Sequence, residues 1–199
     1  MFPRALLWSR TDTAGAEHVT FDDRRGLTAR GVQVANDPIP YACRYELYTD
    51  EGWATARLEA SAEGAGWLRT VRMERAAGRW RVTTAEQGDL DAALRAAGRT
   101  AAAPLPGIED PDSLADAYDV DLYASPLTNT LPLRRVGLVD VAITAAWVLL
   151  PSLAVVASEQ TYTVLGDKRV RYASGTFRAD LDLDEGLFVT NYPGLATLG

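Results

Sequence analysis

The chain has 199 residues, of which 47% are hydrophobic and 24% are charged, and its formal net charge is −7. This length and composition suit one globular domain over residues 1–199, and the acidic balance argues against a nucleic-acid partner, because phosphate binding needs clustered basic side chains. The single cysteine and single histidine exclude an internal disulfide, a cysteine-rich zinc site and a cluster of histidine ligands.

Alternation of apolar and polar side chains predicts short strands through the first half of the chain. Strands are expected at residues 5–8, 18–21, 27–34, 41–49, 53–60, 67–75 and 79–84. Glycine-containing turns at 50–52 and 76–78 join the last four of these into two hairpins. A helix is expected at 89–97, because Asp89 is a suitable N-cap and Gly98 a suitable C-terminal stop.

An apolar stretch dominates the second half. Residues 138–156 carry one charge, at Asp140, and are interrupted by Pro151. A charge and a proline within 19 residues predict two buried strands rather than a membrane-spanning helix. A hairpin at 162–172 and strands at 177–183 and 187–191 follow, and Pro193 and Gly194 are expected to end the structure.

Many short antiparallel strands predict a mainly β fold. Unpaired edges invite pairing with other chains, so a sheet of about ten or eleven strands is expected to close on itself. The predicted architecture is a β-roll or barrel-like closed sheet with one or two short helices. Residues 1–8 do not provide the apolar run of a secretory signal, so the expected compartment is the cytoplasm.

The richest polar segment spans residues 119–135. Asp119 and Asp121 project from the same face of an extended segment, where they could bind a divalent cation, act as an acid–base pair, or pair with Arg134, Arg135 or backbone amides. No further oxygen ligands are identifiable by spacing, so no metal site is assigned, and without a Walker loop or dinucleotide fingerprint no cofactor is expected.

The same segment offers further groups for a ligand. Ser125, Thr128 and Asn129 either present hydroxyl and amide groups to a headgroup or organise a tight loop. An inward guanidinium at Arg134 or Arg135 would bind an anionic group, unless it pairs internally. Among the tryptophans of the predicted strands, Trp53 and Trp147 are candidates to line a cavity.

Several separated segments together resemble the glycolipid-binding family, which was formerly a domain of unknown function. The segments lie in the family's order over nearly the whole chain, and they are residues 45–50 with Trp53, 119–122, 125–135, 151–155, 160–163, 171–172, 177–181, 184–186 and 192–194. The resemblance implies a spiral β-roll, similar to lipoprotein-localisation factors that carry acyl chains in a cavity. The region after Trp53 and the stretch before Asp119 depart from the pattern.

The predicted function is therefore binding of a glycolipid or similar amphiphile by a protein that is not an enzyme. Apolar side chains would hold the tail, and the polar residues of 119–135 would meet the headgroup. One alternative is a hydrolase that acts on a lipid or sugar through Asp119 and Asp121. Another is a protein without a small ligand, whose surface serves protein partners.

Overall fold

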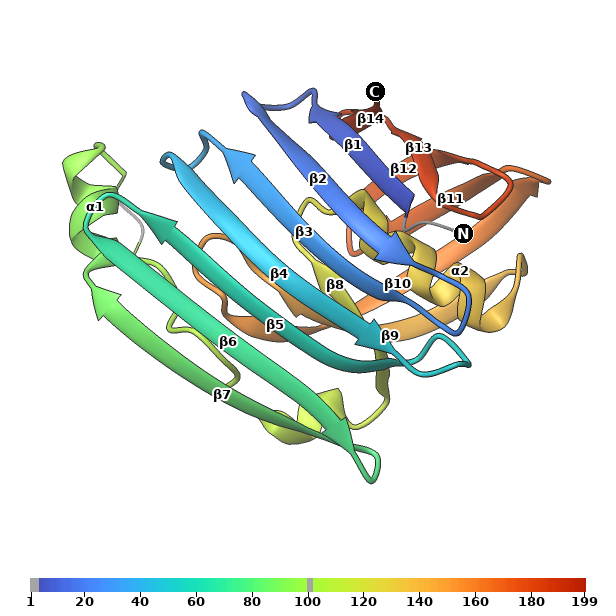
Figure 1. The fold of residues 1–199 in the computed structure, drawn as a ribbon, viewed down its shortest axis with the longest axis horizontal. Helices are drawn as coiled ribbons and strands as arrows, with labels where there is room; N and C mark the ends of the chain where they lie inside the picture. The colour runs from blue at the N-terminus through green and yellow to red at the C-terminus, as the bar shows by residue number, and fades with distance from the viewer. Residues whose placement is uncertain (1–3, 100–101) are drawn as a thin grey trace.

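The computed structural model describes residues 4–99 and 102–199, most of which form one long, curled β-sheet (Figure 1). The first arm of the sheet contains seven strands in chain order. They are β1 (Arg4–Arg10), β2 (Gly15–Asp22), β3 (Thr28–Ala35), β4 (Tyr41–Thr49), β5 (Thr55–Gly64), β6 (Trp67–Ala76) and β7 (Arg79–Gly88).

The second arm contains seven more strands and follows a short helical connection. The connection holds α1 (Leu90–Ala96) and the 3-10 turn η1 (Pro111–Leu114). The arm itself consists of β8 (Ala117–Leu122), η2 (Pro126–Asn129), α2 (Thr130–Val136), β9 (Val141–Val148), β10 (Val155–Gly166), β11 (Arg169–Ser174), β12 (Phe177–Leu183), β13 (Val189–Tyr192) and β14 (Ala196–Leu198).

All fourteen strands hydrogen-bond in one order, β7-β6-β5-β4-β3-β2-β1-β14-β13-β12-β11-β10-β9-β8. Every pairing is antiparallel except β8 with β9, and the two arms join where β1 pairs with β14, with Trp8 opposite Leu198. Figure 1 shows the first arm as a broad layer in front of β8–β10 and α2. The sequence predicted that Pro193 and Gly194 end the structure. This prediction is wrong, because β14 follows them.

The mainly β fold with two short helices is confirmed, but the sheet is not closed among the described residues, so the expected barrel-like closure is not confirmed. Its terminal strands β7 and β8 share no ladder among the described residues. Individual bonds hold the curl instead: the Val120 amide donates to Thr55 Oγ1 at 3.2 Å, and the Trp80 indole donates to the Ala117 carbonyl at 2.9 Å. The terminal strand β7 is largely exposed, so this end of the sheet remains an open edge among the described residues.

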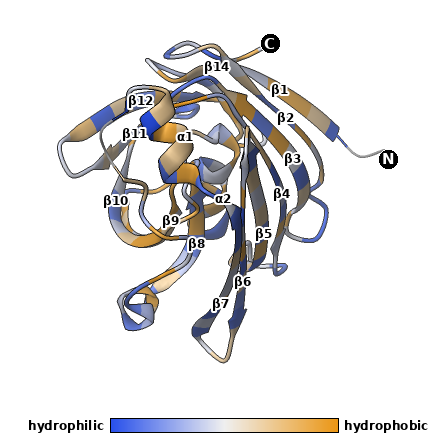
Figure 2. Ribbon diagram, turned by 90° about the vertical axis from the view of Figure 1, so that its left-hand side faces the viewer, coloured by the Kyte–Doolittle hydropathy of each residue, from blue (hydrophilic) through white to orange (hydrophobic). Residues whose placement is uncertain are grey.

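The core fills the space between the arms. Figure 2 shows apolar and polar residues alternating along the strands, the pattern that puts one face of each strand inside. Two clusters of buried side chains share this space, one around Trp8, Phe21 and Leu47 and the other around Tyr162 and Leu181. No helix among the described residues is long and apolar enough to cross a bilayer.

Helix α1 follows from a local signal, whereas α2 was not predicted. Asp89 caps α1 through a bond from the Ala92 amide to its carboxylate, which confirms the predicted cap. Helix α2 covers residues 130–136, for which the sequence predicted no helix. Pro132 is its third residue, where the missing N–H has no helical partner to lose. Leu131 packs into the first core cluster and Leu133 into the second, so α2 connects both arms.

Candidate functional site

Strand β8 places its two carboxylates in different surroundings. Asp119 is 1% exposed and accepts hydrogen bonds from Arg135 Nε and Nη2, the latter at 2.7 Å. Asp121, two residues further along, is partly exposed, and its donors among the described residues are both neutral, Gln160 Nε2 at 2.7 Å and the Thr128 hydroxyl at 3.1 Å. Burial raises the pKa of Asp121 to about 6, although both hydrogen bonds oppose this effect.

A tight connection after β8 aims Ser125, Thr128 and Asn129 inward. Ala124 has a positive φ of 59°, which turns the chain at once into η2. Thr128 Oγ1 accepts from the Leu122 amide at 3.3 Å while it contacts Asp121. Asn129 Nδ2 donates to the Tyr162 hydroxyl at 3.0 Å. The predicted loop-forming residues therefore hold the backbone and face the interior at the same time.

Asp121 opens into a pocket of about 480 Å³ on the inner side of the second arm. Its polar groups come from a loop of the first arm, from β8 and the connection after it, and from β10 and β11. They are Asp12, Asp121, Ser125, Asn129, Ser158 and Ser174. Asp12 is neutralised by Arg10, whose Nε donates to it at 2.7 Å. No lysine or arginine is among the described residues that line this pocket.

Aromatic rings form much of the remaining wall. Tyr172 and Tyr192 are buried, each 6% exposed, whereas Phe177 is 49% exposed and lies at the rim. The ring centroid of Tyr172 lies 6.1 Å from that of Phe177 and 6.3 Å from that of Tyr192. Tyr123 and Trp147, with centroids 6.3 Å apart, complete the set. Such a wall suits stacking against a sugar ring or contact with an alkyl group.

A second hollow, of about 520 Å³, shares Tyr123 with this pocket. It is lined mainly by apolar groups from the β3–β4 connection, from α1 and the loop that follows it, and from the β9–β10 connection. These include Pro38, Leu94, Ala103, Pro104, Leu149 and Pro151. A polar, aromatic pocket beside an apolar hollow gives the protein two chemically different compartments with a common wall residue.

A buried polar network adjoins the pocket at Ser125. The Ser125 hydroxyl donates to Glu17 Oε1 at 2.7 Å, and the Tyr45 hydroxyl donates to the same oxygen. Glu17 is 1% exposed, and burial raises its pKa to about 7. Glu17 Oε2 and Gln33 Oε1 are buried without a partner among the described residues. A proton on Glu17 supplies the missing donor, so the neutral carboxyl fits this network better than the ionised one.

Gly31 makes room for this network, because a Cβ at that position would overlap the ring of Tyr45. Gly31→Ala is expected to destabilise the fold by about 1–3 kcal/mol, since the ring must move away from Glu17. Chemical unfolding of the variant measures the loss. Gly166→Ala is the matched control, because its Cβ meets open space and its φ is not positive. Equal effects of the two substitutions would contradict the role assigned to Gly31.

The structure brings only part of the predicted set to the pocket. Asp121, Ser125, Asn129 and Trp147 line it, and Thr128 touches it through Asp121. Asp119 forms an ion pair with Arg135. Such an internal pair was one of the alternatives to ligand binding that the sequence left open for these residues.

Arg134 and Trp53 lie together outside the pocket. The Arg134 guanidinium stacks 4.1 Å from the centroid of the Trp53 ring, and its Nη1 donates to the Gly186 carbonyl at 3.0 Å. Trp53 is only 6% exposed. This contact joins α2 to the β4–β5 turn, so neither side chain is positioned to meet a ligand in the pocket.

Sequence reasoning did not assign the residues that later strands contribute. Tyr172, Phe177 and Tyr192 reach the pocket from β11, β12 and β13, and Ser158 reaches it from β10. The sequence pattern does not distinguish a core ring from a ring at a pocket, so Tyr172 carried no clear signal. Glu17 carried a usable signal, because it shares the inward face of β2 with Val19 and Phe21.

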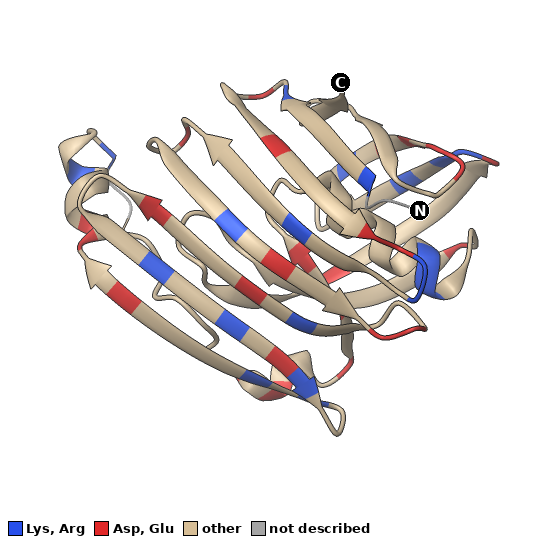
Figure 3. Cartoon of the chain, viewed as in Figure 1, with Lys and Arg blue, Asp and Glu red and all other residues tan. Residues whose placement is uncertain are grey.

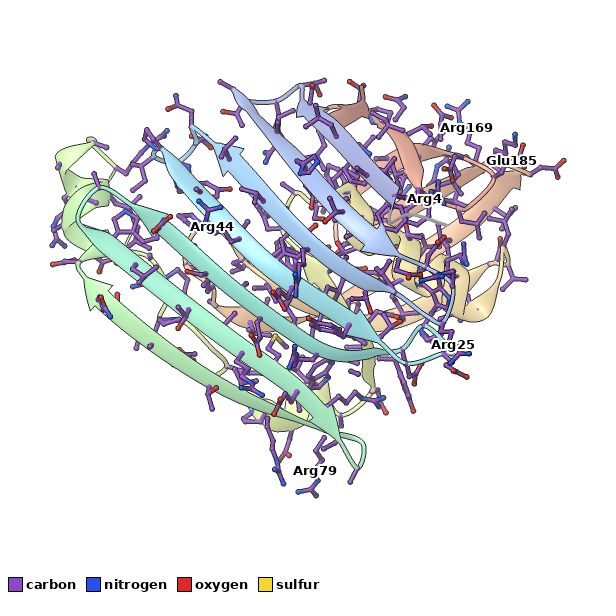
Figure 4. The ribbon with its side chains drawn as sticks, viewed as in Figure 1. Arg4, Arg25, Arg44, Arg79, Arg169 and Glu185 are labelled. Carbon is purple, nitrogen blue, oxygen red and sulfur yellow. The ribbon has the colours of Figure 1, made fainter. Side chains whose placement is uncertain are left out.

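A broader depression, of about 720 Å³, lies on the outer face of β2–β7. Basic and acidic residues occupy positions along the neighbouring strands of this arm (Figure 3), and the Arg44 side chain extends from it in Figure 4. Many of the charges are already paired, for example Arg30 with Glu46 and Arg72 with Glu59. The inner pocket is the better candidate site, because its carboxylate Asp121 is not paired with a cation among the described residues and its rings are free to contact a ligand.

A family model described as "Putative glycolipid-binding" matches residues 5–197. The chain belongs to this family. The glycolipid-binding family model therefore spans both arms of the sheet and includes every residue of the inner pocket. The match confirms the resemblance inferred from the separated sequence segments.

A solved structure shows the same fold. The crystal structure of a DUF1089 family protein from Pseudomonas aeruginosa is 24% identical in sequence, superimposes with a TM-score of 0.69, and aligns over 91% of each chain. At this level of sequence identity, the structural similarity supports a shared fold and nothing further. No curated protein matches the chain.

Proposed function

We propose that the protein binds an amphiphile, with its headgroup in the inner pocket and its alkyl chain along the apolar hollow. The observation that carries this proposal is the shared wall residue Tyr123, which makes the polar pocket and the apolar hollow neighbours. Membership of the glycolipid-binding family supports the same class of ligand.

Each compartment would bind a different part of the ligand. Hydroxyl, amide and carboxylate groups around Asp121 and Asn129 would bond to the headgroup, while the aromatic rings stack against it. Leu94 and Leu149 would cover the chain, and burial of each methylene contributes roughly 0.8 kcal/mol. Affinity would then come mainly from the tail and selectivity from the headgroup.

Chain-length dependence of binding is the expected signature. Titration calorimetry with hexyl, octyl and decyl glucosides should show the dissociation constant falling up to about fourfold per added methylene, the factor that corresponds to full burial. A dissociation constant that does not change with chain length would contradict the proposal.

A substitution in the apolar hollow tests where the alkyl chain of the ligand binds. Leu149→Ser should weaken decyl glucoside binding more than hexyl glucoside binding, because only the longer chain extends fully along the hollow. Leu165→Ser is the matched control: Leu165 is 43% exposed and lines neither compartment. If both variants bind the two glucosides as tightly as the unmodified protein does, the alkyl chain does not bind in the hollow.

The geometry gives little support to hydrolysis by the Asp119 and Asp121 pair. An acid–base pair requires both carboxylates to reach the substrate. Asp119 is bound by Arg135 and is 1% exposed, so Asp121 alone of the two lines the pocket.

A further inference from the structure

The inner pocket holds a carboxylate that no cation balances. Asp121 accepts hydrogen bonds from Gln160 and Thr128, both neutral, and no lysine or arginine forms an ion pair with it among the described residues. Asp12, in the same pocket, is paired with Arg10, and Asp119, on the same strand, is paired with Arg135. With a pKa of about 6, Asp121 is still mainly ionised at neutral pH.

Aromatic rings line the same pocket as this carboxylate. Tyr172, Phe177 and Tyr192 form a triangle with centroid separations of 6.1–6.3 Å, and all three line the same pocket as Asp121. The face of an aromatic ring carries partial negative charge and attracts cations within about 6 Å. The aromatic rings and the carboxylate therefore both favour a positively charged group in the pocket.

We propose that the headgroup bound in the inner pocket carries a positively charged nitrogen, held between the Asp121 carboxylate and the aromatic rings. This inference rests on the proposed function, since it names the chemistry of the headgroup at that site. An anionic head would meet Asp121 and the ring faces without a balancing arginine. A neutral sugar would bond to the carboxylate but leave its charge uncompensated in a partly buried site.

Two headgroups supply this chemistry, a protonated amino sugar and a quaternary ammonium group. Four probes with the same octyl chain separate them from the alternatives: octyl glucoside, octyl 2-amino-2-deoxyglucoside, octyltrimethylammonium and octyl sulfate. Titration at about pH 7 should show at least one cationic probe binding about tenfold more tightly than octyl glucoside, with octyl sulfate the weakest. The cationic probe that binds better identifies the source of the nitrogen.

Asp121→Asn tests the assignment to this carboxylate. It should reduce the cationic advantage over octyl glucoside, measured in the same variant, to within about twofold. Asp167→Asn removes the same charge from an exposed turn between β10 and β11 and should preserve the advantage. Thermal unfolding confirms that both variants are folded, and the four-probe comparison on the unmodified protein does not depend on either of them.

The outcomes separate this inference from the proposed function. Equal binding of octyl glucoside and both cationic probes, or a cationic advantage that persists in Asp121→Asn, would overturn the inference and leave amphiphile binding intact. Failure of all four octyl probes to bind would overturn the proposed function itself, and the inference with it.

Discussion

Replacing Arg135 with methionine is expected to destabilise the folded protein by about 3–5 kcal/mol, because it leaves a buried carboxylate without its partner. Asp119 is 1% exposed and accepts two N–H groups of the guanidinium. Burial raises the pKa of Asp119 even with Arg135 in place, whereas the bond to Asp119 raises the pKa of Arg135. Urea unfolding followed by tryptophan fluorescence measures the loss.

Two further variants distinguish a lost ion pair from lost packing. The double substitution Asp119→Leu with Arg135→Met should recover most of the stability, because it removes the buried charge together with its partner. Arg134→Met, on the same helix, loses the stack on Trp53, one hydrogen bond and a partly exposed ion pair with Asp23, and should cost about 1–2 kcal/mol. If Arg134→Met is as damaging as Arg135→Met, the special role of the buried pair is refuted.

The folded protein is also expected to lose stability as the pH rises from about 4.5 to about 7. Burial raises the pKa of Glu17 from 4.5 to about 7, so the folded state holds a proton that the unfolded state releases. Stability falls with pH wherever the folded state binds more protons, and this group accounts for roughly 3 kcal/mol. The contribution is complete below pH 4.5 and lost once the pH passes about 7. The raised pKa of Asp121 adds a smaller change of the same sign.

Glu17→Gln isolates this contribution. The amide keeps an acceptor for Tyr45 and Ser125 and provides a donor beside Gln33, whose Oε1 has no partner among the described residues. The difference in unfolding free energy between pH 5 and pH 8 should shrink by roughly 3 kcal/mol in the variant. Glu63→Gln, an exposed position on β5, should leave the difference unchanged. An unchanged pH profile in Glu17→Gln would show that Glu17 is not the titrating group.

The sequence predicted local features of the fold well and long-range ones poorly. Asp89 and Gly98 were sufficient to place α1, and Asp140 with Pro151 correctly divided an apolar stretch into β9 and the start of β10. Openness of the sheet and the pairing of β1 with β14 depend on strands that are distant in the chain, and alternation within a strand carries no information about them. Helix α2 is short and contains a proline, so its local signal was weak.

The candidate site shows the same division. Asp121, Asn129 and Trp147 were predicted to meet a ligand, and all three line the pocket. Tyr172 and Tyr192 come from strands β11 and β13 and become pocket residues only because the second arm curls. From the sequence, Asp119 and Asp121 were equally good candidates for the site, because both lie on the same face of an extended strand. They differ in the structure because α2 presents Arg135 to one of them and not to the other.

The order of the strands also bears on how the chain reaches its native state. Every antiparallel pairing except β1 with β14 joins strands that follow one another in the chain. Each arm can therefore grow hairpin by hairpin, with low loop-closure entropy at each step. The contact between β1 and β14 instead closes a loop of nearly the entire chain, and the Trp8 indole fixes it by donating to the Val189 carbonyl at 2.7 Å. We therefore expect nucleation to be local within each arm, and the docking of the two arms at this seam to be the slow, cooperative step of folding.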